Sequence, residues 1–202
     1  MTLKAREAPS RARSILRDAL AQAAGPMGGA TRALSAAPAA EIEAPEPLPV
    51  YVVTPEQILA GTYLETASLE GWSYTMFRGE TPLAGAELAQ VETEDDLHFT
   101  HFSEGPFVEA TVTAIAQAEA FSEQTDQDFE PRIFRCPPLY VMAVWLHSES
   151  RDVLIPMAPT HRLLTAGRAF EREEFDGLLI EAANESLRAA ARANPQTTEP
   201  ET

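Results

Sequence analysis

The chain contains one lysine, Lys4, among its 202 residues. A phosphate-binding loop, a Schiff-base enzyme and a kinase-type ATP site each need a lysine in the folded domain. The motifs GxGxxG and GxSxG are also absent from the sequence, which removes the dinucleotide-binding and α/β-hydrolase fingerprints. We therefore predict no cofactor and name no catalytic residue, although an enzyme of unfamiliar type stays open.

Cysteine and long apolar runs are equally scarce. The single cysteine, Cys136, excludes an internal disulfide and a multi-cysteine metal site, and it favours a reducing compartment. Cys136 could act as a thiol nucleophile with a histidine, but a small buried apolar role is favoured. The longest apolar run is eight residues, against the ~20 that a membrane-spanning helix needs. The prediction is a protein without transmembrane segments, in the cytoplasm or in a compartment to which its N-terminus directs it.

Positive charge is concentrated at the N-terminus. Residues 1–35 carry six basic and two acidic residues, a net charge of +4. Since the whole chain carries −16, the remaining residues carry −20. A domain this acidic repels nucleic-acid phosphates and favours basic partners. We therefore predict no nucleic-acid binding. An acidic inhibitor that mimics nucleic acid is one alternative function.

Residues 1–35 are predicted to form a flexible basic arm with one short amphipathic helix. Ile15, Leu16 and Leu20 fall on the same helical face. Residues 36–49 are rich in alanine, proline and glutamate, a composition typical of an extended linker. Three interpretations of the arm stay open: a disordered tail, an organelle-type presequence, or a docking peptide that folds on a partner.

The centre of the predicted core is a hairpin. Residues 139–146 are apolar at both alternating sets of positions, which is typical of a strand buried on both faces. Residues 147–152 are polar, and residues 153–157 are apolar again. This pattern predicts two antiparallel strands joined by a loop of about four or five residues.

The acidic domain, residues 50–194, is predicted to be α+β, with helices packed on one antiparallel sheet. A capping box at Thr54 starts a helix that could end at Gly61 or continue to Leu69 and stop at Gly71, and the longer version is preferred. Residues 195–202 are predicted to be a disordered tail. The predicted order is helix, three strands, helix, two-strand hairpin, helix. The three strands are expected at 72–77, 82–91 and 97–102, and the second and last helices at 106–121 and 171–193.

This order of elements, together with the acidic charge, resembles the architecture of type III secretion class I chaperones and related small dimeric folds. The resemblance covers roughly residues 54–193 and rests on no sequence motif, so it assigns no residue a role. It implies a dimeric protein-binding fold.

Histidine spacing does not indicate a metal site. His98 and His101 lie three residues apart on a predicted strand, so their side chains point to opposite faces of the sheet. Among 31 acidic residues, no catalytic carboxylate pair can be selected without geometry. No metal ligand is predicted.

The predicted partner-binding residues are apolar and aromatic. Trp72 and Tyr74 alternate along one strand, and they would form a protein-binding surface if no helix covered that face of the sheet. With Ile15, Leu16 and Leu20 of the arm they make up the predicted contact set. The sequence therefore predicts a non-catalytic protein-binding, adaptor or chaperone-like subunit that binds a protein partner and forms a possible homodimer.

Overall fold

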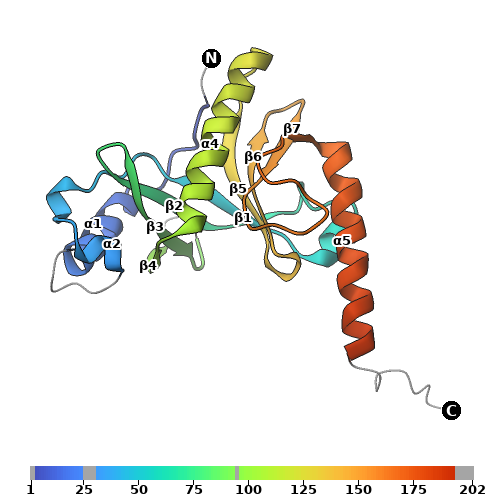
Figure 1. Cartoon of the computed structure of the whole chain (residues 1–202), viewed down its shortest axis with the longest axis horizontal. Helices are drawn as coiled ribbons and strands as arrows, with labels where there is room; N and C mark the ends of the chain where they lie inside the picture. Colours follow the sequence, from blue (N-terminus) through green and yellow to red (C-terminus); the bar gives the residue numbers. More distant parts are fainter. Residues whose placement is uncertain (1–2, 25–30, 94–95, 194–202) are drawn as a thin grey trace.

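One eight-stranded sheet runs through the molecule, with helices on both faces (Figure 1). The computed structural model describes residues 3–24, 31–93 and 96–193. The strand order across the sheet is β4-β3-β2-β1-β5-β6-β7-β8. The strands are β1 Leu48–Val52, β2 Ser68–Arg78, β3 Thr81–Gln90, β4 Leu97–Ser103, β5 Glu130–Cys136, β6 Val141–His147, β7 Asp152–Pro156 and β8 Phe170–Glu171; the helices are α1 Ala12–Ala23, α2 Arg32–Ser35, α3 Pro55–Leu59, α4 Pro106–Thr125 and α5 Arg172–Ala193, with 3-10 turns η1 Ala39–Glu41 and η2 Pro137–Leu139.

The predicted α+β class and the central hairpin are confirmed. Strands β6 and β7 pair antiparallel, and residues 148–151 form the loop between them. Val144 and Trp145, which point to opposite faces of β6, are both almost completely buried. This burial is possible because helices cover the hairpin from both sides.

The prediction of a purely antiparallel sheet is wrong, because β1 and β5 are parallel neighbours. Leu48 and Pro49, assigned to the linker from their composition, begin β1. A proline argues against a central strand because it cannot donate to the ladder. Here the pairing with β5 starts only at Val50, so Pro49 lies outside the parallel ladder.

The order of elements also differs from the prediction on both sides of the helix that starts at Thr54. The capping box at Thr54 is present, but α3 ends at Leu59 instead of continuing to Leu69. Gly61 follows with a φ of 71°, a left-handed conformation that ends helices. Strands β1 and β8 were not predicted, and β5 was not separated from the central hairpin.

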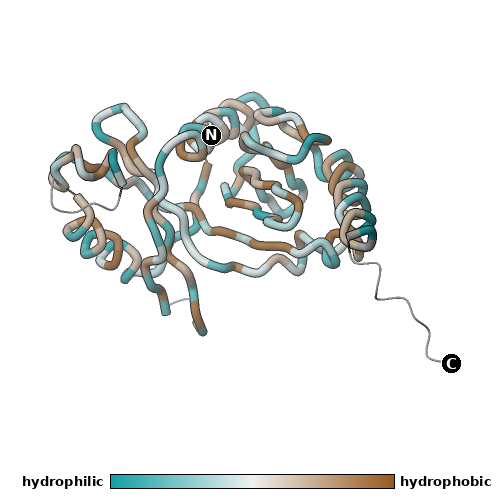
Figure 2. Tube along the Cα trace, turned by 60° about the horizontal axis from the view of Figure 1, so that its bottom comes forward, coloured by the Kyte–Doolittle hydropathy of each residue, from teal (hydrophilic) through white to brown (hydrophobic). Residues whose placement is uncertain are grey.

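Helix α4 lies on one face of the sheet, and α5 and α1 lie on the other face, at opposite ends of the molecule (Figures 1 and 2). The alternation of side chains along the strands produces these layers. In β5, Ile133 belongs to the core under α4, whereas its neighbour Phe134 belongs to the core under α5 and α3. On α5, Phe175, Leu179 and Ala183 are buried, whereas Leu187 is exposed.

The N-terminal segment differs from the predicted free arm, because α1 covers the outer half of the sheet. Its buried side chains, together with Leu34 of α2, share one apolar cluster with a face of β2, β3 and β4 that we call the α1-covered face. The segment before α1 also contacts the domain, through a hydrogen bond from the Lys4 amide to the Phe129 carbonyl. From α1 the cluster contains Ala12, Leu16, Leu20 and Ala23; the α1-covered face consists of Trp72, Tyr74, Met76, Ala84, Ala86, Leu88 and Leu97.

Close contact between β2 and β3 depends on one glycine. A Cβ atom on Gly71 would lie 2.0 Å from the carbonyl oxygen of Leu88 on the neighbouring strand. Only glycine allows two backbones to approach this closely. The register between β1 and β2 shifts at Val50/Tyr51, next to the same glycine, so the sheet bends at this point.

We expect Gly71→Ala to destabilise the protein by about 3 kcal/mol or more, because the two strands must separate to admit the methyl group. Thermal unfolding followed by circular dichroism measures this change. The matched control is Gly177→Ala in α5, where a Cβ meets no atom within 4 Å. That substitution should stabilise the helix by about 0.5–1 kcal/mol. Equal unfolding midpoints for the two variants would contradict the role given to Gly71.

Candidate functional site

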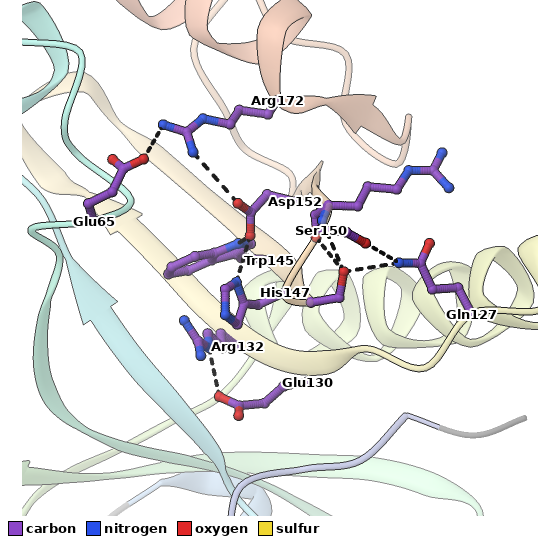
Figure 3. A network of polar contacts seen from close by, with 11 residues as sticks. Glu65, Gln127, Glu130, Arg132, Trp145, His147, Ser150, Asp152 and Arg172 are labelled. Atoms are coloured by element: carbon purple, nitrogen blue, oxygen red, sulfur yellow. Dashed lines mark hydrogen bonds and ion pairs between the residues drawn. The ribbon is translucent and has the colours of Figure 1, made fainter.

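A network of polar side chains lies at the loop end of the β6–β7 hairpin, with Asp152 at its centre (Figure 3). The Oδ1 atom of Asp152 accepts a hydrogen bond of 2.7 Å from Trp145 Nε1 and lies 2.7 Å from His147 Nδ1. His147 and Asp152 are cross-strand neighbours in the hairpin. The carboxylate therefore orients both rings and fixes which imidazole nitrogen faces away from it.

Arg172, the first residue of α5, joins this network to the helical layer. Its guanidinium forms a hydrogen bond of 2.5 Å with Glu65 and lies 3.8 Å from Asp152. Asp176, one turn further along α5, accepts a hydrogen bond of 2.5 Å from the Tyr63 hydroxyl. Burial, followed by this hydrogen bond, raises the pKa of Tyr63 far above its ordinary value. Tyr63 therefore acts as a hydrogen-bond donor and not as a phenolate.

Arg132 packs against the other side of the network. Its guanidinium lies 4.6 Å from the ring centroid of Trp145 and 4.8 Å from that of Tyr51. Glu130 accepts a hydrogen bond of 2.7 Å from Arg132 Nε. A cation between two aromatic rings is stabilised by both π faces, so this arrangement holds β1, β5 and β6 together.

The network could transfer a proton but contains no evident nucleophile. Among the described residues, the Nε2 atom of His147 has no hydrogen-bond partner, and His147 is one of the residues that line a cavity of about 450 Å³. The two nearby hydroxyls are engaged elsewhere: Ser148 bonds to the Arg151 backbone and Ser150 contacts Gln127. Within the described part of the chain, no group of His, Cys, Asp and Glu side chains could hold a metal ion. The ordinary role of such a network is to fix the hairpin end.

A larger cavity of about 680 Å³ lies at the N-terminal end of α4, on the α4 side of the sheet. Its wall is mostly apolar, with a few polar side chains among the lining residues. This composition is typical of a binding pocket. The lining residues are Glu87, His101, Ser103, Phe107, Arg135, Pro137, Tyr140, Val141, Met142, Pro159 and Thr160.

The charged residues of this cavity are paired with each other. Arg135 on β5 binds both carboxylate oxygens of Glu87 on β3, with a distance of 2.8 Å from Nη1 to Oε2. Strands β2 and β1 lie between β3 and β5 in the sheet. Side chains normally stand perpendicular to a sheet, so this contact requires the sheet to curve around the cavity.

The ion pair is formed over a wide pH range. Burial alone would raise the pKa of Glu87, but the hydrogen bond and charge of Arg135, with the charge of His101, outweigh burial and lower it below 4.5. The carboxylate is therefore ionised and fully used by Arg135 at neutral pH. It is not available as a general acid or base.

Tyr140 stands out on the rim of the cavity. It adopts a left-handed backbone conformation, with a φ of 54°, directly after η2. Its side chain is 83% exposed, and that of Phe107 on the same cavity is 47% exposed. A non-glycine residue in this conformation costs on the order of 1 kcal/mol, and an exposed aromatic ring returns little stability. The fold therefore presents this ring outward at a cost.

Cys136 has the buried role that the sequence favoured. The thiol is completely buried in the core under α5. Burial raises its pKa to about 11. A thiol with so high a pKa is protonated at neutral pH and is a poor nucleophile.

The predicted partner-binding residues lie in one cluster, where the residues of α1 and those of the sheet bury each other. Leu16 and Leu20 of α1 are buried in the same apolar cluster as Trp72 and Tyr74, and Ile15 is partly buried against that cluster. The apolar stripe and the apolar sheet face were predicted as two separate surfaces. Whether either one binds a partner stays a prediction.

Sequence reasoning did not single out the cavity at α4. Its lining residues come from β3, β4, α4, β5, β6 and two connections, and no spacing along the chain links them. One local signal was available: Tyr140 follows two consecutive prolines at the start of an otherwise buried strand.

The chain was compared with protein-family models, curated proteins and solved structures, and none of them matches. The resemblance to type III secretion chaperones rested on an order of elements that differs from the structure, so it carries no argument further. None of the described helices is both long and apolar enough to cross a membrane.

We expect Asp152→Ala to destabilise the protein by about 2–3 kcal/mol, because the buried Trp145 Nε1 loses its acceptor. Chemical denaturation followed by tryptophan fluorescence measures the loss. Ser150→Ala removes a contact of 3.5 Å at the edge of the same network, and it should change stability by less than about 0.5 kcal/mol. A small effect of Asp152→Ala would contradict the central role of this carboxylate.

Glu87→Gln should weaken the protein at neutral pH by about 2 kcal/mol, because a charged hydrogen bond is lost. The pKa of Glu87 is lower in the folded than in the unfolded protein, so its contribution is present above about pH 4.5 and disappears as pH falls through the folded value. The difference in unfolding free energy between variant and parent should therefore shrink towards pH 3. A pH-independent difference would contradict the coupling of Glu87 to Arg135.

Proposed function

We propose that the protein is a non-catalytic protein-binding subunit that holds an apolar segment of a partner in the cavity at the start of α4. The observation that carries this proposal is the outward-facing Tyr140, which is 83% exposed in a left-handed conformation beside a mostly apolar cavity. Exposed aromatic rings around an apolar pocket are the usual anchors of protein interfaces.

The electrostatics of the cavity support binding more than catalysis. Arg135 engages both carboxylate oxygens of Glu87, so the cavity offers no free carboxylate to a substrate. The acidic charge of the domain favours a partner whose flanking residues are basic. Nucleic acid is disfavoured as a ligand for the same reason.

The proposal also covers the compartment in which the protein works and whether it forms a dimer. A single buried cysteine suits a reducing compartment, and we propose the cytoplasm. A homodimer is one way to cover Tyr140 and Phe107, since an exposed apolar rim favours association.

An enzyme of unfamiliar type is the second candidate, favoured by one observation. His147 lines a cavity, while Asp152 holds its Nδ1. A histidine oriented in this way could act as a general base. The mark of this function would be an activity that His147→Gln abolishes without unfolding the protein.

The test of the binding proposal is removal of the two rim aromatics. A photoreactive phenylalanine analogue at position 140 of the full chain should cross-link a partner in an extract of the source cells, and mass spectrometry identifies that partner. In the double variant Phe107→Ala and Tyr140→Ala, affinity for the purified partner should fall at least about tenfold. The unfolding midpoint should stay nearly unchanged, because both side chains are exposed.

The matched control is the double variant Val91→Ala and Leu187→Ala. Both residues are exposed and apolar, and neither lines the cavity. This variant should bind the partner as the parent does. Equal affinities of the parent and the aromatic double variant would overturn the proposed function.

A further inference from the structure

Two polar side chains of the α1-covered face are buried without a hydrogen-bond partner. The indole Nε1 of Trp72 and the hydroxyl of Tyr74 are inaccessible to solvent, and neither has a partner among the described residues. Both side chains are 1% exposed. Burial raises the pKa of the Tyr74 hydroxyl to about 12. A buried donor without an acceptor is costly, so α1 is an imperfect occupant of this face.

Helix α1 is also weakly held. No side chain caps its N-terminus, and its first and last turns carry no residues that complement the helix dipole. Its buried stripe consists of two leucines and two alanines. An isolated helix of twelve residues is marginal in water, so its order depends on this contact.

The polar rim of the α1-covered face is acidic. Glu46 pairs with Arg13 of α1 at the surface, and Glu104 accepts a hydrogen bond of 2.9 Å from the Ala33 amide of α2. A second occupant would meet the same carboxylates. It would therefore need basic residues beside its apolar stripe.

We propose that the α1-covered face is a docking site for an amphipathic helix of a partner protein, and that α1 is the intramolecular occupant that this helix displaces. The partner helix carries a leucine-type stripe with one acceptor side chain, such as glutamine or serine, for Trp72 and Tyr74, and basic flanks for Glu46 and Glu104. This surface lies on the opposite side of the sheet from α4 and its cavity, so the inference does not rest on the function proposed above.

We infer a helical partner segment because α1, which occupies this face in the structure, is itself an amphipathic helix. The face accepts residues 12, 16, 20 and 23 of α1, a spacing that another amphipathic helix reproduces. A second copy of this chain offers only the same α1, with the same unpaired donors beneath it. The tethered α1 has the advantage of high effective concentration over such a copy. A partner helix that accepts hydrogen bonds from Trp72 Nε1 and the Tyr74 hydroxyl gains binding free energy that α1 does not obtain.

The test uses a fluorescein-labelled peptide with the sequence of residues 9–24 as the probe and the full chain as the receptor. Anisotropy measures its affinity for the parent and for Arg13→Glu, which places two acidic side chains together at the rim and weakens α1 alone. The probe should bind the variant at least about tenfold more tightly than the parent, because the competing helix is held less well. Leu16→Ala with Leu20→Ala provides a second weakened α1.

A control peptide with aspartate at positions 16 and 20 should bind none of these proteins. Circular dichroism and thermal unfolding show whether each variant stays folded, and Arg13 is exposed enough for its replacement to leave the core intact. Equal affinity of the probe for the parent and Arg13→Glu, or no binding to either, would overturn the proposal.

The acceptor requirement has its own test. Two further probes carry serine in place of Ala12 or Ala23, both of which lie in the buried stripe. At least one serine probe should bind the Arg13→Glu protein about threefold more tightly than the unmodified probe does. Replacing both Tyr74 and Trp72 of that protein by phenylalanine should remove this gain. If neither serine probe binds more tightly, the partner chemistry proposed here is wrong.

Discussion

The parallel pairing of β1 with β5 is the contact on which the rest of the structure depends. It joins the antiparallel strands β2, β3 and β4 to the second set, β5 to β8, and makes one sheet of the two. Parallel neighbours need a long connection, and here that connection contains α3, three strands and α4. Since α4 must return across the sheet, one face becomes its packing surface and the other is left for α1, α3 and α5.

The curvature of this sheet places both proposed interaction surfaces. On the α4 side the bend brings Glu87 and Arg135 together and leaves a cavity beside the helix start. On the opposite side it presents Trp72 and Tyr74 to α1. The polar network around Asp152 lies further along the sheet and has a different character. Most of its polar groups bind one another, which suits a structural role at the end of the hairpin.

Several elements could be predicted from the sequence because their patterns are local. The central hairpin followed from a run that is apolar at both alternating positions, and the capping box at Thr54 from four adjacent residues. The cavity could not be predicted, because its lining residues are distant in the chain and share no spacing. Strand β1 was missed because Pro49 argues against a strand unless the ladder starts after it.

The sequence by itself determined the α+β class, the buried hairpin, the unreactive role of Cys136 and the amphipathic character of α1. Each depends on the periodicity or chemistry of neighbouring residues. Only the tertiary structure decided that β1 and β5 are parallel and that the stripe of Leu16 and Leu20 packs into one cluster with Trp72 and Tyr74. An apolar stripe shows that a helix needs a partner surface, and long-range packing selects which surface it is. For the same reason, the cost of burying two unpaired polar atoms becomes visible only in the folded chain.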